Sequence, residues 1–319
     1  MCGGWICGSR LYEVTMRIDC HNDTVGFLRN NDSLERQSGA HLDFERLRTY
    51  LDCSFFAVFI DQKKYAADLS GEFSRMLGLL KADIAQAPGV ELLLNGSQLD
   101  TDPPEKSLIL LSMEGASPLG DDGELLDEYF AAGLRALGLT WNYATPYAGG
   151  AREGGGVTAA GRRLISRCND LGILLDGAHA SHAAFSDLLR LSRSPIIDSH
   201  TVCAAFGDDF GRALTDEELR ALAAQGGVAA LTVVAAFLGA GGSLDRLCEH
   251  LEYAVSLIGS EHVGLGADYD GAKLAPEMAG VQFLPALYGR LRQRGMAESD
   301  LENVKGNSVR RLLRQVLPR

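Results

Sequence analysis

The sequence predicts an α/β protein, a (β/α)8 barrel of the TIM type with a metal site at the C-terminal ends of the strands. About eight apolar, strand-like runs alternate with amphipathic helical segments along the chain. Several of these runs are continuously apolar, as is typical of parallel strands buried on both faces. Side chains that commonly bind metals follow the runs at their C-terminal ends, where barrels of this kind build their active sites.

The expected strands are short and distributed over the whole chain. They cover residues 16–20, 55–60, 108–113, 135–140, 173–176, 195–198, 228–234 and 263–267. Amphipathic patterns predict helices over residues 66–87, 124–132, 159–171, 182–191, 216–224, 244–258, 283–294 and 298–316. The sequence TDEEL favours a helix start, because Thr215 can cap the helix while Glu218 takes the capping-box position.

Length and composition fit one large domain. The chain has 319 residues, of which 46% are hydrophobic and 23% charged, and it shows no internal repeat, low-complexity tract or linker. Residues 16–319 are therefore expected to form a single barrel domain. Residues 1–15 are expected to be an N-terminal extension outside the core, since Met16 begins the first strand-like run.

Charge and cysteine usage narrow the class of partner and the compartment. The formal net charge of −12 disfavours nucleic acid or an anionic membrane as partner. The seven cysteines are scattered without CxxC pairs, which favours reduced thiols in the cytoplasm over a disulfide framework. The longest uncharged run, residues 225–244, fits a buried strand and a Gly-rich loop better than a membrane span.

Five side chains of the metal-ligand type follow the expected strands: His21, Asp23, Glu114, His179 and His200. His21 and Asp23 are two residues apart, and a strand places such a pair on one face. Three imidazoles and two carboxylates suit one or two divalent metals of the zinc type. Because parallel strands end at the same face of a barrel, we expect the five side chains to converge there.

Each candidate also has a structural alternative. A single His at a strand end is more often a hydrogen-bonded structural residue than a ligand, but three such His with two carboxylates are hard to obtain by chance. Glu114 follows an apolar run, where an unpaired buried carboxylate would be costly, and a metal removes that cost. Asp268 ends the last expected strand in the same way, and a helix cap or a turn is its alternative role.

The remaining histidines have ordinary surroundings. His262 precedes its strand, and at ~3.3 Å per residue it is expected roughly 20 Å from Asp268, at the other end of the barrel. His182 is expected to face outward on a helix. His41 and His250 lie in polar stretches that read as helical.

Several motifs together resemble the renal (membrane) dipeptidase family of the amidohydrolase superfamily. In chain order they are DCHNDT, SMEGASPL, LGILLDGAHAS, SPIIDSHT, VGLGADYDG and GNSVRRLL. The resemblance runs from about Met16 to the C-terminus and keeps the order and spacing of the motifs. It implies the same barrel fold that the strand and helix pattern predicts.

The resemblance also implies a site with two zinc ions, with other divalent transition metals as alternatives. His21 and Asp23 would hold one ion, His179 and His200 the other, and Glu114 would bridge both. A hydroxide shared by the metals would attack the amide carbon of a small dipeptide. Relatives of this family are commonly dimers, so a homodimer is a further expectation.

The family pattern assigns roles in handling substrate as well. Asp268 would carry a proton from the bridging water to the leaving amine. Arg212, in the loop after His200, would bind the terminal carboxylate of the substrate. Trp141 stands where relatives have a His that contacts the substrate carbonyl, and Asn142 is the alternative donor there. A Tyr of relatives that helps to bind the carboxylate is replaced around Val234.

Three functions follow as hypotheses. The first is a dipeptidase, including dipeptides with a C-terminal D-residue, and the second is a hydrolase of another small amide in a biosynthetic or degradative pathway. The third is a non-catalytic, metal-stabilised binding protein, which the complete ligand set and Asp268 disfavour. Arg212 separates the first two, because it matters only for a substrate with a free carboxylate.

Overall fold

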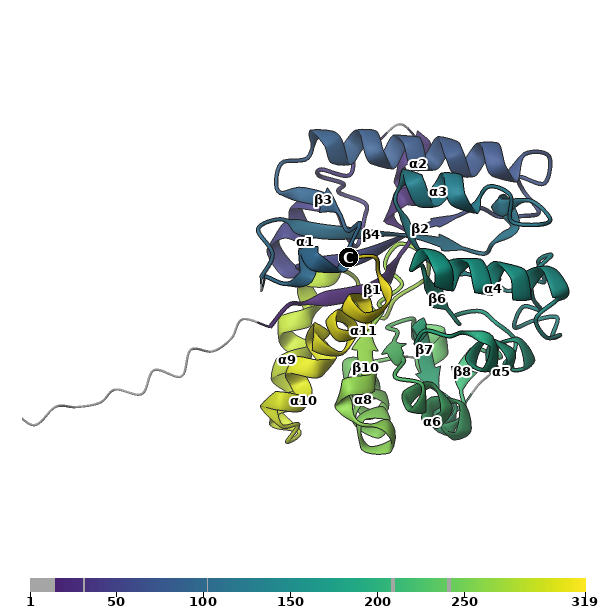
Figure 1. Ribbon diagram of the computed structural model, residues 1–319. Helices are drawn as coiled ribbons and strands as arrows, with labels where there is room; N and C mark the ends of the chain where they lie inside the picture. Colours follow the sequence, from purple (N-terminus) through teal and green to yellow (C-terminus); the bar gives the residue numbers. More distant parts are fainter. Residues whose placement is uncertain (1–14, 31, 102, 208–209, 240–241) are drawn as a thin grey trace, which may run out of the picture.

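Eight parallel strands form the wall of a barrel, as the sequence predicts (Figure 1). The computed structural model describes residues 15–30, 32–101, 103–207, 210–239 and 242–319. The expected N-terminal extension, residues 1–15, lies outside the described residues except for Thr15. In barrel order the strands are β1 (Ile18–Asn22), β2 (Cys53–Phe59), β4 (Ser107–Glu114), β5 (Leu134–Gly138), β6 (Leu174–Asp176), β7 (Ile197–Cys203), β9 (Val228–Leu231) and β10 (Val263–Leu265).

Two short strands extend the sheet beyond this wall, and the sequence did not reveal them. They are β3 (Val90–Leu92), which pairs with β4, and β8 (Ala213–Leu214), which pairs with β7. With only three and two residues, neither carries enough apolar alternation to be recognised.

The first and last strands meet through backbone hydrogen bonds beyond the end of β10. The amide of Asp268 donates to the carbonyl of His21 at 3.0 Å, and the amide of Asp23 donates to the carbonyl of Tyr269 at 2.8 Å. A side chain also takes part: the amide of Ala267 donates to Oδ1 of Asp19 at 2.8 Å. Closure of the barrel therefore occurs at the segments that carry candidate site residues.

Helices surround the wall (Figure 1). They are α1 (Phe44–Tyr50), α2 (Leu69–Gln86), α3 (Leu126–Ala132), α4 (Ala159–Leu171), α5 (His182–Leu191), α6 (Asp216–Ala224), α7 (Ala235–Leu238), α8 (Leu244–Ile258), α9 (Leu284–Gln293), α10 (Glu298–Glu302) and α11 (Ser308–Val316). Four expected helices have the predicted bounds, and Thr215 caps α6 with Glu218 in a capping box. No helix within the described ranges is long and apolar enough to cross a membrane.

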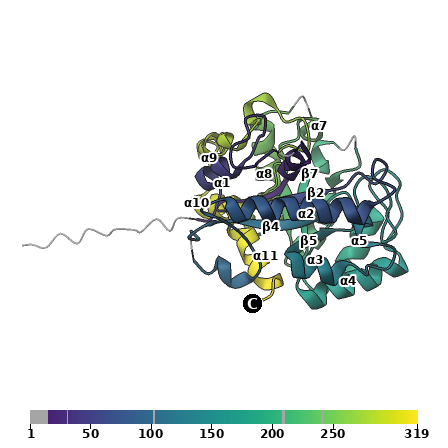
Figure 2. The ribbon, with the colours of Figure 1, turned by 90° about the horizontal axis from the view of Figure 1, so that it is seen from above.

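The inside of the barrel is filled from below by α11. Inward side chains such as Ile18, Phe55 and Leu110 form one apolar cluster with Val309 and Leu312 of that helix. Figure 2 shows α11 at one end of the barrel and α7, which follows β9, at the other. Side chains thus fill the N-terminal end of the barrel, and the site expected from the sequence lies at its C-terminal end.

His250 is buried, which corrects the expectation of a polar setting. It lies on α8 with no exposed surface, and its Nδ1 accepts a hydrogen bond from the amide of Cys203 at 3.1 Å. Its Nε2 lies 3.4 Å from the carbonyl of Leu238. The polar residues around it in the sequence belong to the outer face of α8, so the local composition concealed its inward direction. Burial lowers the pKa of His250 to about 4.

Candidate metal centre

The alternation of β4 delivers Glu114 to the inside of the barrel. Leu108 and Leu110 belong to the interior cluster, and residues two apart along a strand share a face. Glu114, at the last position of β4, therefore points inward above that cluster. Gly115 follows with φ +83°, a conformation that lets the chain turn sharply away from the strand end.

Irregular pairing in β1 and β7 directs two histidines into the same space. Cys20 belongs to the interior cluster, so a regular strand would turn His21 outward. The pairing of β1 with β2 shifts between Asp19 and Asn22, and the pairing of β7 with β9 shifts between Asp198 and Thr201. Such bulges re-aim side chains, and here the rings of His21 and His200 come within 3.9 Å. The sequence placed His200 beyond the end of its strand. In the structure β7 continues to Cys203, so His200 lies within the strand.

Left-handed backbone conformations mark the remaining loops of the site. Among the described non-glycine residues, positive φ occurs at His179 (64°), Asp268 (61°) and Asp270 (67°). Such conformations cost free energy in non-glycine residues and gather at functional sites. Gly271 completes the turn: a Cβ there would lie 2.1 Å from Oδ2 of Asp23 and 2.3 Å from Oδ1 of Asp268.

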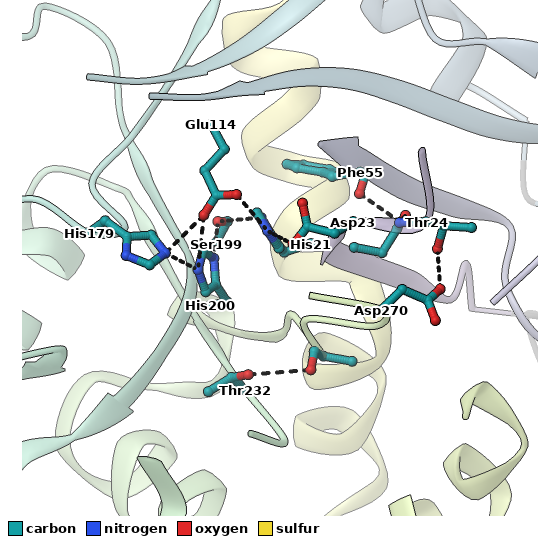
Figure 3. A network of polar contacts seen from close by, with 12 residues as sticks. His21, Asp23, Thr24, Phe55, Glu114, His179, Ser199, His200, Thr232 and Asp270 are labelled. Atoms are coloured by element: carbon teal, nitrogen blue, oxygen red, sulfur yellow. Dashed lines mark hydrogen bonds and ion pairs between the residues drawn. The ribbon is translucent and has the colours of Figure 1, made fainter. Parts of the chain in front are cut away.

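The five expected ligands converge on the carboxylate of Glu114 (Figure 3). Its Oε1 lies 2.9 Å from Nε2 of His179 and 3.8 Å from Nε2 of His200. Its Oε2 lies 3.7 Å from Nε2 of His21, which is 3.7 Å from Oδ2 of Asp23. Oε1 thus faces the nitrogens of His179 and His200, and Oε2 faces the nitrogen of His21. Ligand atoms of His21, Glu114 and His200 all lie within 4.8 Å of one another.

Electrostatics favour a cation among these groups. Burial lowers the pKa values of His179 and His200 well below the ordinary value of histidine. Both imidazoles therefore stay neutral, and the neutral form is the one that binds metals. Burial also raises the pKa of Glu114 well above its usual range. Burial would lower the pKa of His21, but the carboxylates of Glu114 and Asp23 outweigh it and raise that pKa to about 10.

The hydrogen bonds behind the imidazoles also fit a metal. Nδ1 of His179 lies 2.9 Å from Oδ1 of Asn142, and Nδ1 of His200 lies 2.9 Å from Oγ of Ser199. A ring whose Nδ1–H is bonded in this way presents the lone pair of Nε2 to the front. The Nε2 of His21 and Oδ1 of Asp23 are buried without a hydrogen-bond partner. These orphaned atoms suit a cation of the kind that imidazole and carboxylate bind.

Asp268 lies beside the His21 side of the cluster. One of its carboxylate oxygens falls within 4.8 Å of ligand atoms of His21 and Asp23. Burial raises the pKa of Asp268 to about 7, which is the range in which a carboxylate exchanges protons at neutral pH.

Arg212 is buried next to His200. Its Nη2 donates to the carbonyl of His200 at 3.0 Å, and its guanidinium lies 5.9 Å from the ring centre of Phe237. Val234, also buried, precedes α7 on the same side. The structure thus brings Arg212 to the rim of the cluster.

Trp141 and Asn142 lie on the His179 side. The ring centre of Trp141 is 6.0 Å from that of His179 and 4.9 Å from that of Phe59. The side chain of Asn142 is engaged by His179, as described above. Sequence reasoning did not name Phe59, because an aromatic residue in a buried strand has no signal that sets it apart from the core.

Sequence reasoning also missed a cavity of about 190 Å³ beside Asp23. Its lining includes Arg29, Phe59 and Met76. Asp270 closes one side and ties the loop before α1 to the site: it accepts hydrogen bonds from Thr24 Oγ1 at 2.6 Å and from the amide of His41 at 2.6 Å. His41 therefore has a role in a loop, not in a helix as expected. Long-range contacts of this kind leave no local pattern in a sequence.

A TIM-type barrel with imidazoles and carboxylates gathered at the C-terminal ends of its strands defines a metallohydrolase-type protein. The model of one family, the membrane dipeptidases (peptidase family M19), matches residues 8–317. The chain belongs to this family, which confirms the resemblance seen in its motifs.

Two curated relatives illustrate the match. A protein of Klebsiella pneumoniae described as an uncharacterized protein in the pqqA 5′ region is 32% identical over 258 residues, covering 76% of this chain and 95% of its own length. Dipeptidase 3 of Rattus norvegicus is 26% identical over 318 residues, covering 94% of this chain. The chain spans 64% of the length of that dipeptidase.

Two solved structures share the fold over nearly the whole chain. A dipeptidase described as a metallo peptidase of family M19 superposes with a TM-score of 0.89 at 27% identity, covering 96% of this chain and 100% of its own. A metallo peptidase from Rhodobacter sphaeroides, liganded with a phosphinate mimic of the dipeptide L-Ala-D-Ala, superposes with a TM-score of 0.86 at 26% identity. The alignment covers 95% of this chain and 99% of that one.

Proposed function

We propose that this protein is a dipeptidase with two zinc ions that hydrolyses the amide bond of small dipeptides. The observation that carries the proposal is the position of Glu114, whose two carboxylate oxygens face His179 and His200 on one side and His21 on the other. A carboxylate placed in this way can bridge two cations, and family membership supports the same reaction class.

The roles follow from the two groups around Glu114. His21 and Asp23 would hold one metal, His179 and His200 the other, and Glu114 both, with other divalent transition metals as alternatives to zinc. Bound metals of this kind supply a nucleophilic hydroxide and polarise the substrate carbonyl. Most of these side chains are buried, and a low local dielectric strengthens charge interactions between them.

Asp268 would act as the proton carrier. Its raised pKa, about 7, allows it to take a proton at neutral pH and to release it in the same cycle. In the proposed reaction it accepts a proton as the amide carbon is attacked and donates one to the leaving amine.

Arg212 would bind the free carboxylate of the substrate with its planar guanidinium. It lies beside His200, so the rest of the dipeptide would extend from Arg212 across the metals. Trp141 would border the substrate, and Asn142 would contact it beside His179. The Rhodobacter sphaeroides relative bound to a mimic of L-Ala-D-Ala supports including dipeptides with a C-terminal D-residue.

We further propose that residues 16–319 act as one catalytic unit, as a homodimer in the cytoplasm. The single barrel supports the first point, and the free thiols of Cys20, Cys53, Cys168, Cys203 and Cys248 suit a reducing compartment.

The direct test joins metal analysis to a substrate panel. The purified chain should contain about two zinc-like ions and should hydrolyse members of a panel of L,L and L,D dipeptides. Glu114→Ala should lose at least one ion and the activity, because the shared ligand is gone. A chain that binds no transition metal on titration would refute the proposal.

The panel also separates the alternatives. Activity on amides without a free carboxylate, with none on dipeptides, would indicate a hydrolase of another small amide. Two bound metals without any hydrolysis would indicate a metal-stabilised binding protein.

A further inference from the structure

Ser199 lies behind two of the proposed ligands at once (Figure 3). Its Oγ is 2.9 Å from Nδ1 of His200 and 3.4 Å from Nδ1 of His21. Ser199 itself has no exposed surface. His21 and His200 belong to different metal positions in the proposed site, so one hydroxyl touches a ligand of each.

The oxygen of Ser199 can accept hydrogen bonds from both imidazoles. An imidazole that binds a metal through Nε2 carries its hydrogen on Nδ1 and donates it to a partner behind the ring. A serine oxygen has two lone pairs and can accept both donations. The same oxygen can therefore fix the ring orientation of His21 and of His200 when both bind metals.

The backbone of Ser199 is anchored independently of the imidazoles. Its amide donates to Oδ1 of Asp176 at 3.0 Å, and the same oxygen accepts from the amide of Ala178 at 3.0 Å. Asp176 thus joins the turn that carries His179 to the strand that carries Ser199. A hydroxyl held on a fixed backbone can orient its partners rather than follow them.

We propose that Ser199 is a positioning residue for both metal positions, and that its hydroxyl links the ligands of the two from behind as Glu114 does from the front. The inference rests on the proposed two-metal function. Asn142 offers the contrast, because within the described part of the chain its side chain contacts one proposed ligand, His179. Loss of Ser199 should therefore weaken two metal positions, and loss of Asn142 one.

The test measures metal affinity directly. Metal-free wild type, Ser199→Ala and Asn142→Ala are titrated with Zn²⁺ in competition with a chromophoric chelator, and the curves are fitted to two sites. Ser199→Ala should bind more weakly at both positions, each by roughly 10- to 100-fold, the usual effect of removing a partner of a metal-binding His. Asn142→Ala should show that loss at one position only.

Ser308→Ala is the matched control. Ser308 is also a buried serine, but its Oγ donates to the carbonyl of Val263 at 2.7 Å, away from the metal centre. It should leave both zinc affinities unchanged. Thermal unfolding in excess chelator checks the fold of each variant, and Ser199→Gly, which also lacks the hydroxyl, replaces Ser199→Ala if the latter does not fold.

The outcomes separate the two proposals. Two zinc ions in the wild type with unchanged affinities in Ser199→Ala, or with a loss at one position only, would overturn the role of Ser199. A wild type that does not bind two ions would overturn the proposed function instead.

Discussion

At the scale of single residues, Asp268 combines three properties that a proton carrier needs. It is buried, its pKa is raised to about 7, and its backbone is held by the amide hydrogen bond to His21. Because that bond uses the main chain, the side chain can be changed without opening the barrel. Asn also tolerates the left-handed conformation that Asp268 adopts.

Asp268→Asn should therefore keep its metals and lose turnover. Loss of a general acid–base group typically lowers the rate by roughly 10²- to 10⁴-fold. Steady-state kinetics on a cleaved dipeptide, with metal analysis of the same sample, measure both quantities. A variant with near-normal kcat would show that Asp268 has a structural role.

Arg212→Ala should mainly raise KM for dipeptides, with a smaller fall in kcat, if the carboxylate is bound equally in the ground and transition states. Amidation of the substrate carboxylate should lower the activity of the wild type and barely change that of the variant. Equal sensitivity of both enzymes to amidation would show that another residue binds the carboxylate.

Residue types and their positions could be predicted well from the sequence, whereas side-chain partners could not. Glu114 and His179 were recognisable because each follows an apolar run. Asn142 and Ser199 were not recognisable as their neighbours' hydrogen-bond partners, since those contacts join segments 37 and 178 residues apart. The side-chain direction of a polar residue beside a strand depends on the folded surroundings.

At the scale of elements, the eight wall strands were predictable and their irregularities were not. Apolar runs marked β4 and β9, but the polar run DSHT concealed the second half of β7, which continues to Cys203. The bulges in β1 and β7 that turn His21 and His200 inward depend on the register of neighbouring strands, which local sequence does not encode.

His250 makes the stability of the α8 packing depend on pH. Its pKa is about 4 in the folded protein against 6.5 ordinarily, so between these values the unfolded chain binds more protons than the native one. Stability should therefore fall as the pH falls from 6.5 to 4, by on the order of 3 kcal/mol in full.

His250→Gln removes this titration while keeping a donor and an acceptor. Chemical denaturation of metal-free protein at several pH values should show a smaller loss of stability in the variant. Ser308→Ala, which changes a buried residue without a titratable side chain, is the control and should keep the pH dependence of the wild type. If the stability of His250→Gln fell with pH as steeply as that of the wild type, other groups would cause the acid sensitivity.

At the scale of the whole molecule, metals should stabilise the fold. Each site at a free metal concentration 100 times its Kd adds about 2.7 kcal/mol to the free energy of unfolding. Calorimetry with and without a chelator should therefore show a Tm several degrees lower in the metal-free protein. Glu114→Ala should respond less to the chelator, since it binds less metal and no longer buries an uncompensated carboxylate.

Closure of the barrel at the metal centre gives the chain a particular order of assembly. Asp19 and Ala267, whose contact helps to join the first and last strands, are 248 residues apart in the sequence. During synthesis His21 and Asp23 emerge early but receive their backbone partners only after β10 has been made. Metal capture is thus expected to be a late event that reports a finished barrel, and fragments that end before β10 should lack it.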